Sequence, residues 1–350
     1  MERKNGFEEF VENVKDRIKD YLPGKYENAV IEVSRHEKIN ESYLGMCVWT
    51  GGNAASPILN LEMYYALCQG GLTGMEDVIR RMADIVQENT IPVDLSLVTD
   101  YGRTKENLFI RVCDAGRNGE LLKNIPHTRI DDLAVTYHIL RSIDAGGMSS
   151  MTVTSQMMAD LGITKEQLHQ DAIENSPRLF PPMIENIGTM LRLFEMKAAG
   201  LEEEDISEIR KTMDQDMQIP MLVVTNREQI NGASALFYPG ILDQVGEMMG
   251  EGYFILPSSV HEWIIVPDRE GFDANEMQVM IMDANQNAVT PDIQLGDEAY
   301  HYDPKEHVFE KASVYEERLK SREKGLETGG KQKRTEPDQK QKDNVIRLSL

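Results

Sequence analysis

The pattern of apolar and polar positions predicts helices and paired strands in alternation along the chain. Residues 7–21 repeat apolar side chains at helical spacing and are followed by a Pro-Gly pair, which ends the helix. Residues 28–40 and 41–52 alternate apolar and polar positions instead, which predicts a hairpin laid against that helix. Residues 75–89 predict the clearest helix, with a buried stripe formed by Met75, Val78, Ile79, Met82, Ile85 and Val86.

The second half of the chain combines short strands with helices in the same way. Residues 133–140 and 151–155 predict two strands joined through a Gly-Gly turn, and Thr164 supplies an N-cap for the next helix. Residues 221–268 predict a β-α-β-β unit, and residues 277–282 predict one further strand. Because most of these connections are short hairpins, the predicted fold class is α+β, with mixed, largely antiparallel sheet elements and packed helices.

The domain organisation follows from changes in composition. We expect residues 1–312 to form one composite domain with two lobes, approximately 1–145 and 146–312, joined by a Gly-rich connection. Residues 313–350 are poor in apolar side chains and rich in Lys, Gln, Glu and Gly. This composition predicts a disordered basic tail beyond a short helix.

Charge is unevenly distributed along the chain. The 350 residues have a formal net charge of −22. Residues 311–350 hold 11 Lys and Arg against 7 Asp and Glu, which leaves 26 against 52 in residues 1–310. A body this acidic repels phosphate backbones and anionic lipid, so we expect its folded part to bind neither nucleic acid directly nor a membrane. A protein partner is compatible with this charge.

The cysteines and the N-terminal residues indicate a reducing compartment. Cys47, Cys68 and Cys113 are widely spaced, odd in number and outside any CxxC pattern, which argues against a disulfide framework and a thiolate zinc site. The first residues contain no apolar signal segment, and no run of about 18 apolar residues that would span a bilayer occurs. We therefore expect a cytoplasmic protein with reduced thiols.

Four phrases of the sequence resemble those of one family. They are IPHTRIDDLAVTY from Ile125, LHQDAIENSPRLFPP from Leu168, the segment from Tyr238 that contains PSSVHEW, and LGDEAYHYD from Leu295. In this order they are similar to phrases of a bacterial family known as domain of unknown function 5688, and the resemblance covers most of residues 5–310. Gly296 stands where the family phrase has serine. The resemblance implies a bacterial cytoplasmic protein, and it implies no activity, cofactor or catalytic residue.

The most compact group of potentially reactive side chains lies in PSSVHEW, residues 257–263. Nucleophilic catalysis needs a hydroxyl, an imidazole and an orienting carboxylate, and Ser259, His261 and Glu262 supply these three groups. On an ideal strand, however, Ser259 and His261 lie about 6.5–7 Å apart, and no GxSxG elbow is present. The alternative is a structural turn, in which the hydroxyls of Ser258 and Ser259 bond backbone groups and His261 bonds a carbonyl or carboxylate.

Four further polar residues are candidates for ligand binding. His127 and Asp132 lie in the phrase IPHTRIDDLAV, and Asn226 and Tyr238 precede the PSSVHEW segment as possible neighbours of it in the fold. We expect no metal site, because the seven histidines form no HExxH motif and no recognised ligand spacing. We also expect no cofactor, because neither GxGxxG nor GxxxxGK[ST] occurs.

These observations leave three functions open. The first is a non-catalytic interaction or regulatory protein of the bacterial cytoplasm. The alternative is an enzyme, most plausibly a hydrolase that uses Ser259, His261 and Glu262. The third is an acidic mimic of nucleic acid that binds a basic protein. A polar pocket at His261 would favour the enzyme, and an exposed apolar patch would favour the interaction protein.

Overall fold

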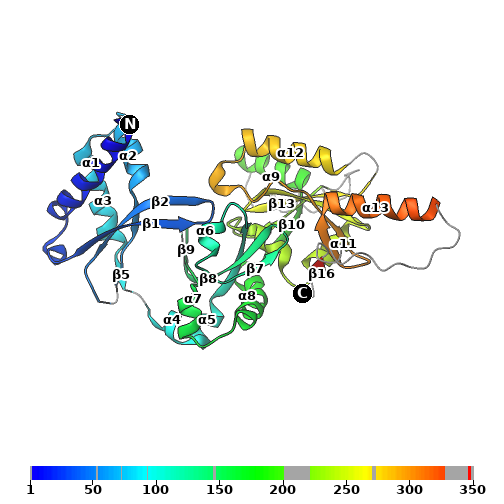
Figure 1. Ribbon diagram of the computed structural model, residues 1–350, viewed down its shortest axis with the longest axis horizontal. Coiled ribbons are helices and arrows are strands. Elements are labelled where there is room, and N and C mark those ends of the chain that lie inside the picture. The colour runs from blue at the N-terminus through cyan, green and yellow to red at the C-terminus, as the bar shows by residue number, and fades with distance from the viewer. Residues whose placement is uncertain are drawn as a thin grey trace. The chain divides into compact units, whose positions relative to one another are not determined.

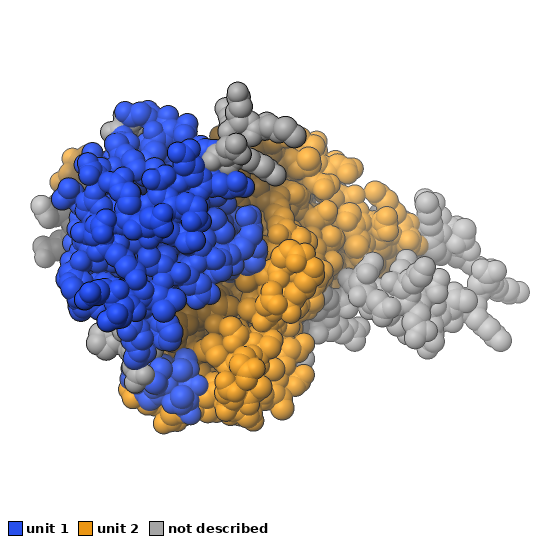
Figure 2. Space-filling model, turned by 60° about the vertical axis from the view of Figure 1, so that its left-hand side comes forward, with its two compact units in different colours: residues 1–99 blue, residues 100–350 orange. Residues whose placement is uncertain are grey.

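The chain folds into two compact units of mixed helix and sheet. A computed structural model describes residues 2–52, 54–71, 73–92, 94–144, 147–200, 221–269, 273–327 and 346–347. Unit 1 comprises residues 1–99 and unit 2 residues 100–350, and each unit is described by itself (Figures 1 and 2). Helices packed on antiparallel sheets confirm the predicted α+β fold class. Within the described residues, no helix combines the length and apolar character needed to cross a bilayer.

The boundary between the units lies earlier than the expected lobe boundary. It falls at residues 99 and 100, between helix α4 (Ser96–Thr99) and helix α5 (Tyr101–Glu106). The expected boundary near residue 145 falls instead between strands β8 (Leu133–Asp144) and β9 (Gly147–Thr152), which pair as one hairpin inside unit 2. A Gly-Gly sequence suits both a linker and a tight turn, and Asp144 and Gly147 are partners in the hairpin.

Unit 1 is a three-stranded antiparallel sheet with helices on one face (Figure 1). Besides α4, its elements in chain order are α1 (Glu2–Arg17), η1 (Ile18–Tyr21), η2 (Gly24–Tyr26), β1 (Val30–Lys38), β2 (Glu41–Trp49), β3 (Ala54–Ala55), β4 (Ile58–Asn60), α2 (Leu61–Gln69), α3 (Met75–Asn89) and β5 (Ile91–Pro92). The sheet has the order β1-β2-β4, and the two-residue strands β3 and β5 pair with each other.

Alternation along the strands of unit 1 gives the sheet an inner and an outer face. Met46, Val48 and Leu59 point inward and join one core with the buried stripe of α3, as the spacing in residues 75–89 predicts. The hairpin β1–β2 runs without a bulge from the pair Val30 and Trp49 to its turn, as predicted. The outer face therefore presents the other set of side chains, which do not belong to this core.

Unit 2 contains a four-stranded and a seven-stranded sheet, both antiparallel. Besides α5, β8 and β9, its elements are β6 (Leu108–Asp114), α6 (Gly119–Leu122), β7 (His127–Ile130), α7 (Ser155–Asp160), α8 (Lys165–Leu179), β10 (Pro182–Asn186), α9 (Ile187–Ala198), β11 (Leu222–Asn226), η3 (Gly232–Phe237), α11 (Ile241–Met249), β12 (Tyr253–Ser259), β13 (Glu262–Pro267), α12 (Ala274–Asn287), η4 (Pro291–Ile293), β14 (Tyr300–Asp303), β15 (Val308–Lys311), α13 (Ala312–Glu327) and β16 (Ile346–Arg347).

Different helices pack against the two sheets of unit 2. In the four-stranded sheet, β6 and β7 flank β8, β9 also pairs with β8, and α8 packs against β6 and β8. The seven-stranded sheet has the order β10-β11-β13-β12-β14-β15-β16. Its face with Phe254 and Val266 packs against α12 and α13, whereas Trp263 and Tyr253 on the other face bond backbone oxygens of η3 and α11. The predicted β-α-β-β unit of residues 221–268 is therefore the middle of this sheet.

One prediction about the last hundred residues is wrong. Residues 277–282 are helical within α12, because Ala274, Met277 and Ile281 are buried at helical spacing and Asp273 caps the helix. The helix expected at the start of the tail is α13, which has 16 residues and is tied to the sheet by side-chain bonds. The prediction of disorder for residues 328–345 and 348–350 lies outside the described residues.

Candidate functional site

The predicted cluster Ser259, His261 and Glu262 lies at the tip of the β12–β13 hairpin. The tip is a two-residue turn, Val260 and His261, and the pairing register shifts at Ser258. Ser259 and Glu262 are cross-strand partners on either side of the turn. The predicted hairpin is confirmed, but the expected turn at Ser258 and Ser259 is wrong, because both residues belong to β12 and the turn follows them. The His261 ring also bonds a backbone N–H and not the expected carbonyl or carboxylate.

The ring of His261 bonds the backbone of a neighbouring loop. Its Nδ1 accepts a hydrogen bond from the Asn231 N–H at 3.0 Å, which places the proton of the neutral ring on Nε2. The His261 N–H donates to the Ser259 hydroxyl at 3.1 Å, so this hydroxyl supports the turn. Burial lowers the pKa of His261 below its usual range; Glu262 and Asp292 oppose this shift, and Arg111 adds to it.

Gly232 lets the loop and the hairpin approach each other closely. A Cβ at this position would lie 2.5 Å from the carbonyl oxygen of His261 and 2.7 Å from the backbone nitrogen of Asn226, and it would also collide with the Thr225 hydroxyl. That hydroxyl donates to the same His261 oxygen at 2.7 Å. Backbone and side-chain bonds therefore fix both ends of residue 261, and a residue with a side chain does not fit at position 232.

The other members of the predicted site are placed separately. Glu262 accepts from the Ser258 hydroxyl at 3.1 Å. The Asn226 side chain bonds both backbone groups of Ile230 and so closes the loop that supports His261. Tyr238 is buried and bonds Ser234, and burial raises the pKa of its hydroxyl to about 12.

Asp132 belongs to a different part of unit 2. It accepts from the Tyr300 hydroxyl at 2.6 Å and pairs with Lys311 at 3.1 Å. These bonds connect the β7–β8 turn of the four-stranded sheet to strands β14 and β15 of the seven-stranded sheet. Among the described residues, Asp132 forms no hydrogen bond with His261 or His127.

His127 lies on a polar row of the four-stranded sheet that the sequence analysis did not single out. The register pairs His127 with Thr136 and Thr136 with Arg111, so these three side chains share one face. On the next row, His138 lies between Phe109 and Thr152. His138 Nε2 bonds the Thr136 hydroxyl at 2.9 Å, and Arg111 donates to the Ser150 hydroxyl at 2.7 Å.

Arg111 dominates the electrostatics of this row. Burial lowers the pKa of Arg111 to about 10. Burial also lowers the pKa of His138 well below its usual range, and Arg111 lowers it further. Arg111 acts on His261 as well, so the row and the hairpin tip lie within electrostatic range of each other. The sequence does mark Arg111, because it is the single charged residue in the apolar run LFIRVC.

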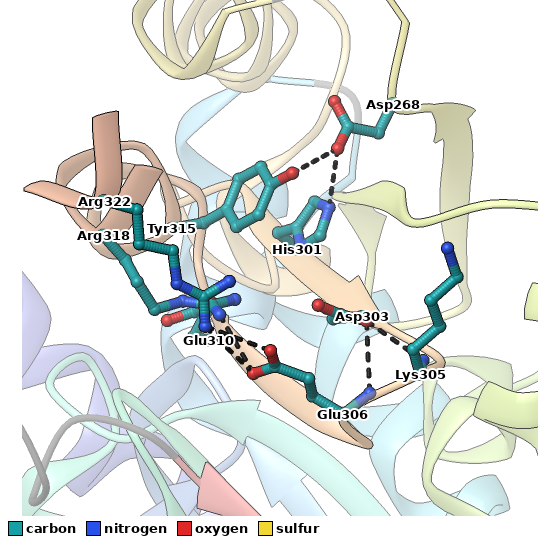
Figure 3. A network of polar contacts seen from close by, with 9 residues as sticks. All are labelled: Asp268, His301, Asp303, Lys305, Glu306, Glu310, Tyr315, Arg318 and Arg322. Carbon is teal, nitrogen blue, oxygen red and sulfur yellow. Dashed lines mark hydrogen bonds and ion pairs between the residues drawn. The ribbon is translucent and has the colours of Figure 1, made fainter. Parts of the chain in front are cut away.

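A second polar network binds α13 to the seven-stranded sheet (Figure 3). Asp268 accepts from the Tyr315 hydroxyl at 2.5 Å and lies 3.1 Å from His301 Nε2, while the rings of Tyr315 and His301 stack 3.5 Å apart. Burial raises the pKa of Asp268, but the bonds to His301 and Tyr315 outweigh burial and hold it below its usual range. Tyr315, Arg318 and Arg322 of α13 bond Asp268, Glu310 and Glu306, and these contacts attach the helix to the sheet (Figure 3).

One pocket of about 630 Å³ opens between α5 and α8. Its lining comprises Gly102, Lys105, Glu106, Asp171, Glu174, Asn175 and Arg178. Asp171 bonds Tyr101 and pairs with Lys105 at 2.6 Å, and Asn175 and Arg178 bond the Glu106 carbonyl. These contacts connect the two helices that line the pocket, and none of the predicted site residues lines it.

Comparison with known proteins places the chain in a family without giving it an activity. Among the described residues, no group of three or more His, Cys, Asp or Glu side chains is arranged to hold a metal ion. Neither the curated proteins nor the solved structures give a significant match to the chain. Residues 7–304 match the profile of a family of unknown function (DUF5688), as the four phrases of the sequence implied, and the chain belongs to that family.

Proposed function

We propose that the protein is a non-catalytic interaction protein of the bacterial cytoplasm, which docks another protein on the outer face of the unit 1 sheet. The observation that supports this proposal is a cluster of exposed apolar side chains on that face. Val30 and Trp49 are cross-strand partners and are 58% and 50% exposed. On the next row, Ile58 pairs with Cys47 and is 44% exposed.

The end of the outer face around Trp49 has the character of a protein-binding surface, whereas Glu32, Ser34 and Lys38 elsewhere on this face are polar, as on a solvated sheet. A sheet with one solvated face normally alternates apolar and polar positions, and the outer set of side chains is then polar. Here a tryptophan lies among aliphatic side chains, and buried tryptophans dominate the energetics of many interfaces. The free thiols of Cys47, Cys68 and Cys113 suit the reducing cytoplasm.

The hydrolase alternative requires a different arrangement at the hairpin tip. Ser259 would have to direct its hydroxyl at the His261 ring, and Glu262 would have to orient that ring. In the structure the Ser259 hydroxyl accepts from the backbone of His261, and Glu262 bonds Ser258. The geometry therefore supports the interaction protein better than the enzyme.

The proposal is tested by measuring how partner binding depends on Trp49. Proteins that co-purify with the full chain from the source bacterium are identified, purified and titrated against it to obtain a Kd. We expect Trp49→Ala to weaken binding about 30-fold or more, because truncating a central aromatic residue commonly costs about 2 kcal/mol or more. Met280, on α12 of unit 2 and 55% exposed, provides a matched control, and Met280→Ala is expected to change the Kd less than about threefold.

Two results would contradict this function. One is a reconstituted complex whose Kd is the same for Trp49→Ala and for the unchanged chain. The other is hydrolysis of ester or amide substrates by the purified chain that Ser259→Ala and His261→Ala both abolish, which would establish the enzyme instead.

A further inference from the structure

One edge of the unit 1 sheet is open. Strand β1 pairs with β2 on one side, and no described strand pairs with its other side. Among the described residues, no loop supplies backbone bonds to this edge either. None of the nine residues of β1 is buried, whereas four residues of β2 are. The edge is therefore accessible, and it presents backbone donors and acceptors to solvent.

The register of the β1–β2 hairpin determines which residues of β1 direct their backbone groups to the open edge. Lys38 and Glu41 flank the two-residue turn, and such a flanking pair is hydrogen-bonded. The Leu44 N–H bonds Glu62 instead of β1, so the pair that Leu44 forms with Arg35 is not hydrogen-bonded. Both observations assign the bonds with β2 to the even-numbered residues of β1. The residues whose N–H and C=O face the open edge are therefore Ile31, Val33, Arg35 and Glu37.

These outward residues are arranged symmetrically about Ser34, the middle residue of β1. A strand that pairs antiparallel with a second copy of itself has a two-fold axis, and one residue then lies opposite its own copy. With Ser34 on this axis, Ile31 faces Glu37 of the second copy, and the two residues exchange both backbone bonds. Val33 and Arg35 form the next pair in the same way. This one register satisfies every outward N–H and C=O of the strand.

We propose that β1 pairs with β1 of a second copy of this chain, in a symmetric dimer whose sheet continues through both copies. The strand suits such pairing because it is long and contains neither a bulge nor a proline, the devices that commonly protect an edge. The open edge lies beside the docking face and not on it. The dimer is therefore independent of the partner that binds at Trp49.

The charges of β1 fit the register centred on Ser34. Glu32 then faces His36 of the second copy and lies diagonal to its Lys38, which carries the opposite charge. A register centred on Arg35 would instead place two guanidinium groups opposite each other, which is unfavourable. Charge complementarity therefore selects the same register as the backbone groups do.

Sedimentation equilibrium of the full chain measures the Kd of the dimer. Arg35→Pro removes the outward N–H that Val33 of the second copy would accept, and we expect it to weaken the dimer about 30-fold or more. A proline is tolerated in an edge strand where its nitrogen faces solvent, so the single copy should still fold.

Arg35→Ala is the matched control for this measurement. It removes the same side chain, which is 60% exposed, and retains the backbone N–H, so the Kd should change less than about threefold. Circular dichroism should be the same for both variants, because the N–H of residue 35 has no strand partner within one copy. Trp49→Ala should leave the Kd of the dimer unchanged, which separates this dimer from the proposed docking function.

Cysteine cross-linking tests the register. Ser34→Cys places two thiols at a pair that is not hydrogen-bonded, where the Cα atoms lie about 4.5 Å apart and a disulfide can form. With Cys47 and Cys68 replaced by Ser, mild oxidation of this variant should give a disulfide-linked dimer. Glu32→Cys in the same background is the control, because the two copies of residue 32 would lie about 14 Å apart along the strands.

Each measurement has an outcome that contradicts the proposal. A full chain that stays monomeric at every concentration would overturn the dimer. Equal Kd values for Arg35→Pro and Arg35→Ala would show that the two copies do not associate through the edge of β1. A cross-link that forms with Glu32→Cys and not with Ser34→Cys would overturn the register.

Discussion

At the scale of single residues, Gly232 determines how closely the Asn231 loop can approach the His261 turn. Replacing Gly232 with Ala is expected to lower the free energy of unfolding of unit 2 by about 3 kcal/mol. The new Cβ would lie 2.5 Å and 2.7 Å from two backbone atoms, which cannot move aside as a flexible side chain would. Urea unfolding is followed through the fluorescence of the buried Trp263, in a Trp49→Phe background so that unit 2 alone is observed.

Gly119→Ala is the control for this measurement. Nothing lies within 4 Å of a Cβ at position 119, so the free energy of unfolding should change by less than about 0.5 kcal/mol. Equal midpoints for the two alanine variants would show that the loop and the hairpin have room to separate.

Single residues also differ in how far their role in a site can be predicted from the sequence. The order of Pro257, Ser258 and Ser259 predicts a turn from local chemistry, and the turn forms two residues later, at Val260 and His261. The sequence shows Arg111 as the single charge in the apolar run LFIRVC, but it does not show which groups surround its side chain. The burial of its Nε, and the absence of an acceptor for Nε among the described residues, depend on strands that are distant in the sequence.

At the scale of elements, helix α13 owes its attachment to a buried ion pair. Glu310 on β15 has a fully buried side chain, and Arg318 on α13 donates to it at 2.5 Å and 3.0 Å. Arg318→Ala should lower the free energy of unfolding of unit 2 by about 3 kcal/mol, because it leaves a carboxylate buried without its counter-ion. The midpoint of urea unfolding measures this loss, and amide hydrogen exchange locates it in α13.

Arg322 on the same helix provides the control. It pairs with Glu306 and is 55% exposed, so Arg322→Ala should change the free energy of unfolding by less than about 0.5 kcal/mol. If the two variants lost equal stability, the buried pair would contribute no more to the attachment of α13 than a surface pair does.

Long elements with a clear period were predictable, and short apolar runs were not. Helix α3 and the hairpin β1–β2 follow the predicted positions because each repeats its period several times. Residues 277–282 form a short run of Met, Val and Ile that fits a strand or a helix equally well. Packing decides for the helix, because Met277 and Ile281 both reach the core between α12 and the sheet.

At the scale of the whole molecule, the two units have separate hydrophobic cores. The core of unit 1 consists of residues from its own sheet and helices, and Phe254, Leu256 and Val266 belong to a different core in unit 2. The boundary at residues 99 and 100 was not predictable from composition, because no Gly- or Pro-rich segment marks it. A boundary of this kind follows from which residues share a core.

Separate cores predict separate unfolding. Met82 is fully buried in unit 1, and Met82→Ala should destabilise that unit by about 2–5 kcal/mol through the cavity it leaves. The Trp263 fluorescence transition of unit 2 should not move, while circular dichroism should show an earlier loss of helix. Ile255→Ala, at a fully buried position of β12, should move the Trp263 transition instead. If Met82→Ala moved both transitions equally, the units would unfold as one cooperative body, and the docking face of unit 1 could not act independently of unit 2.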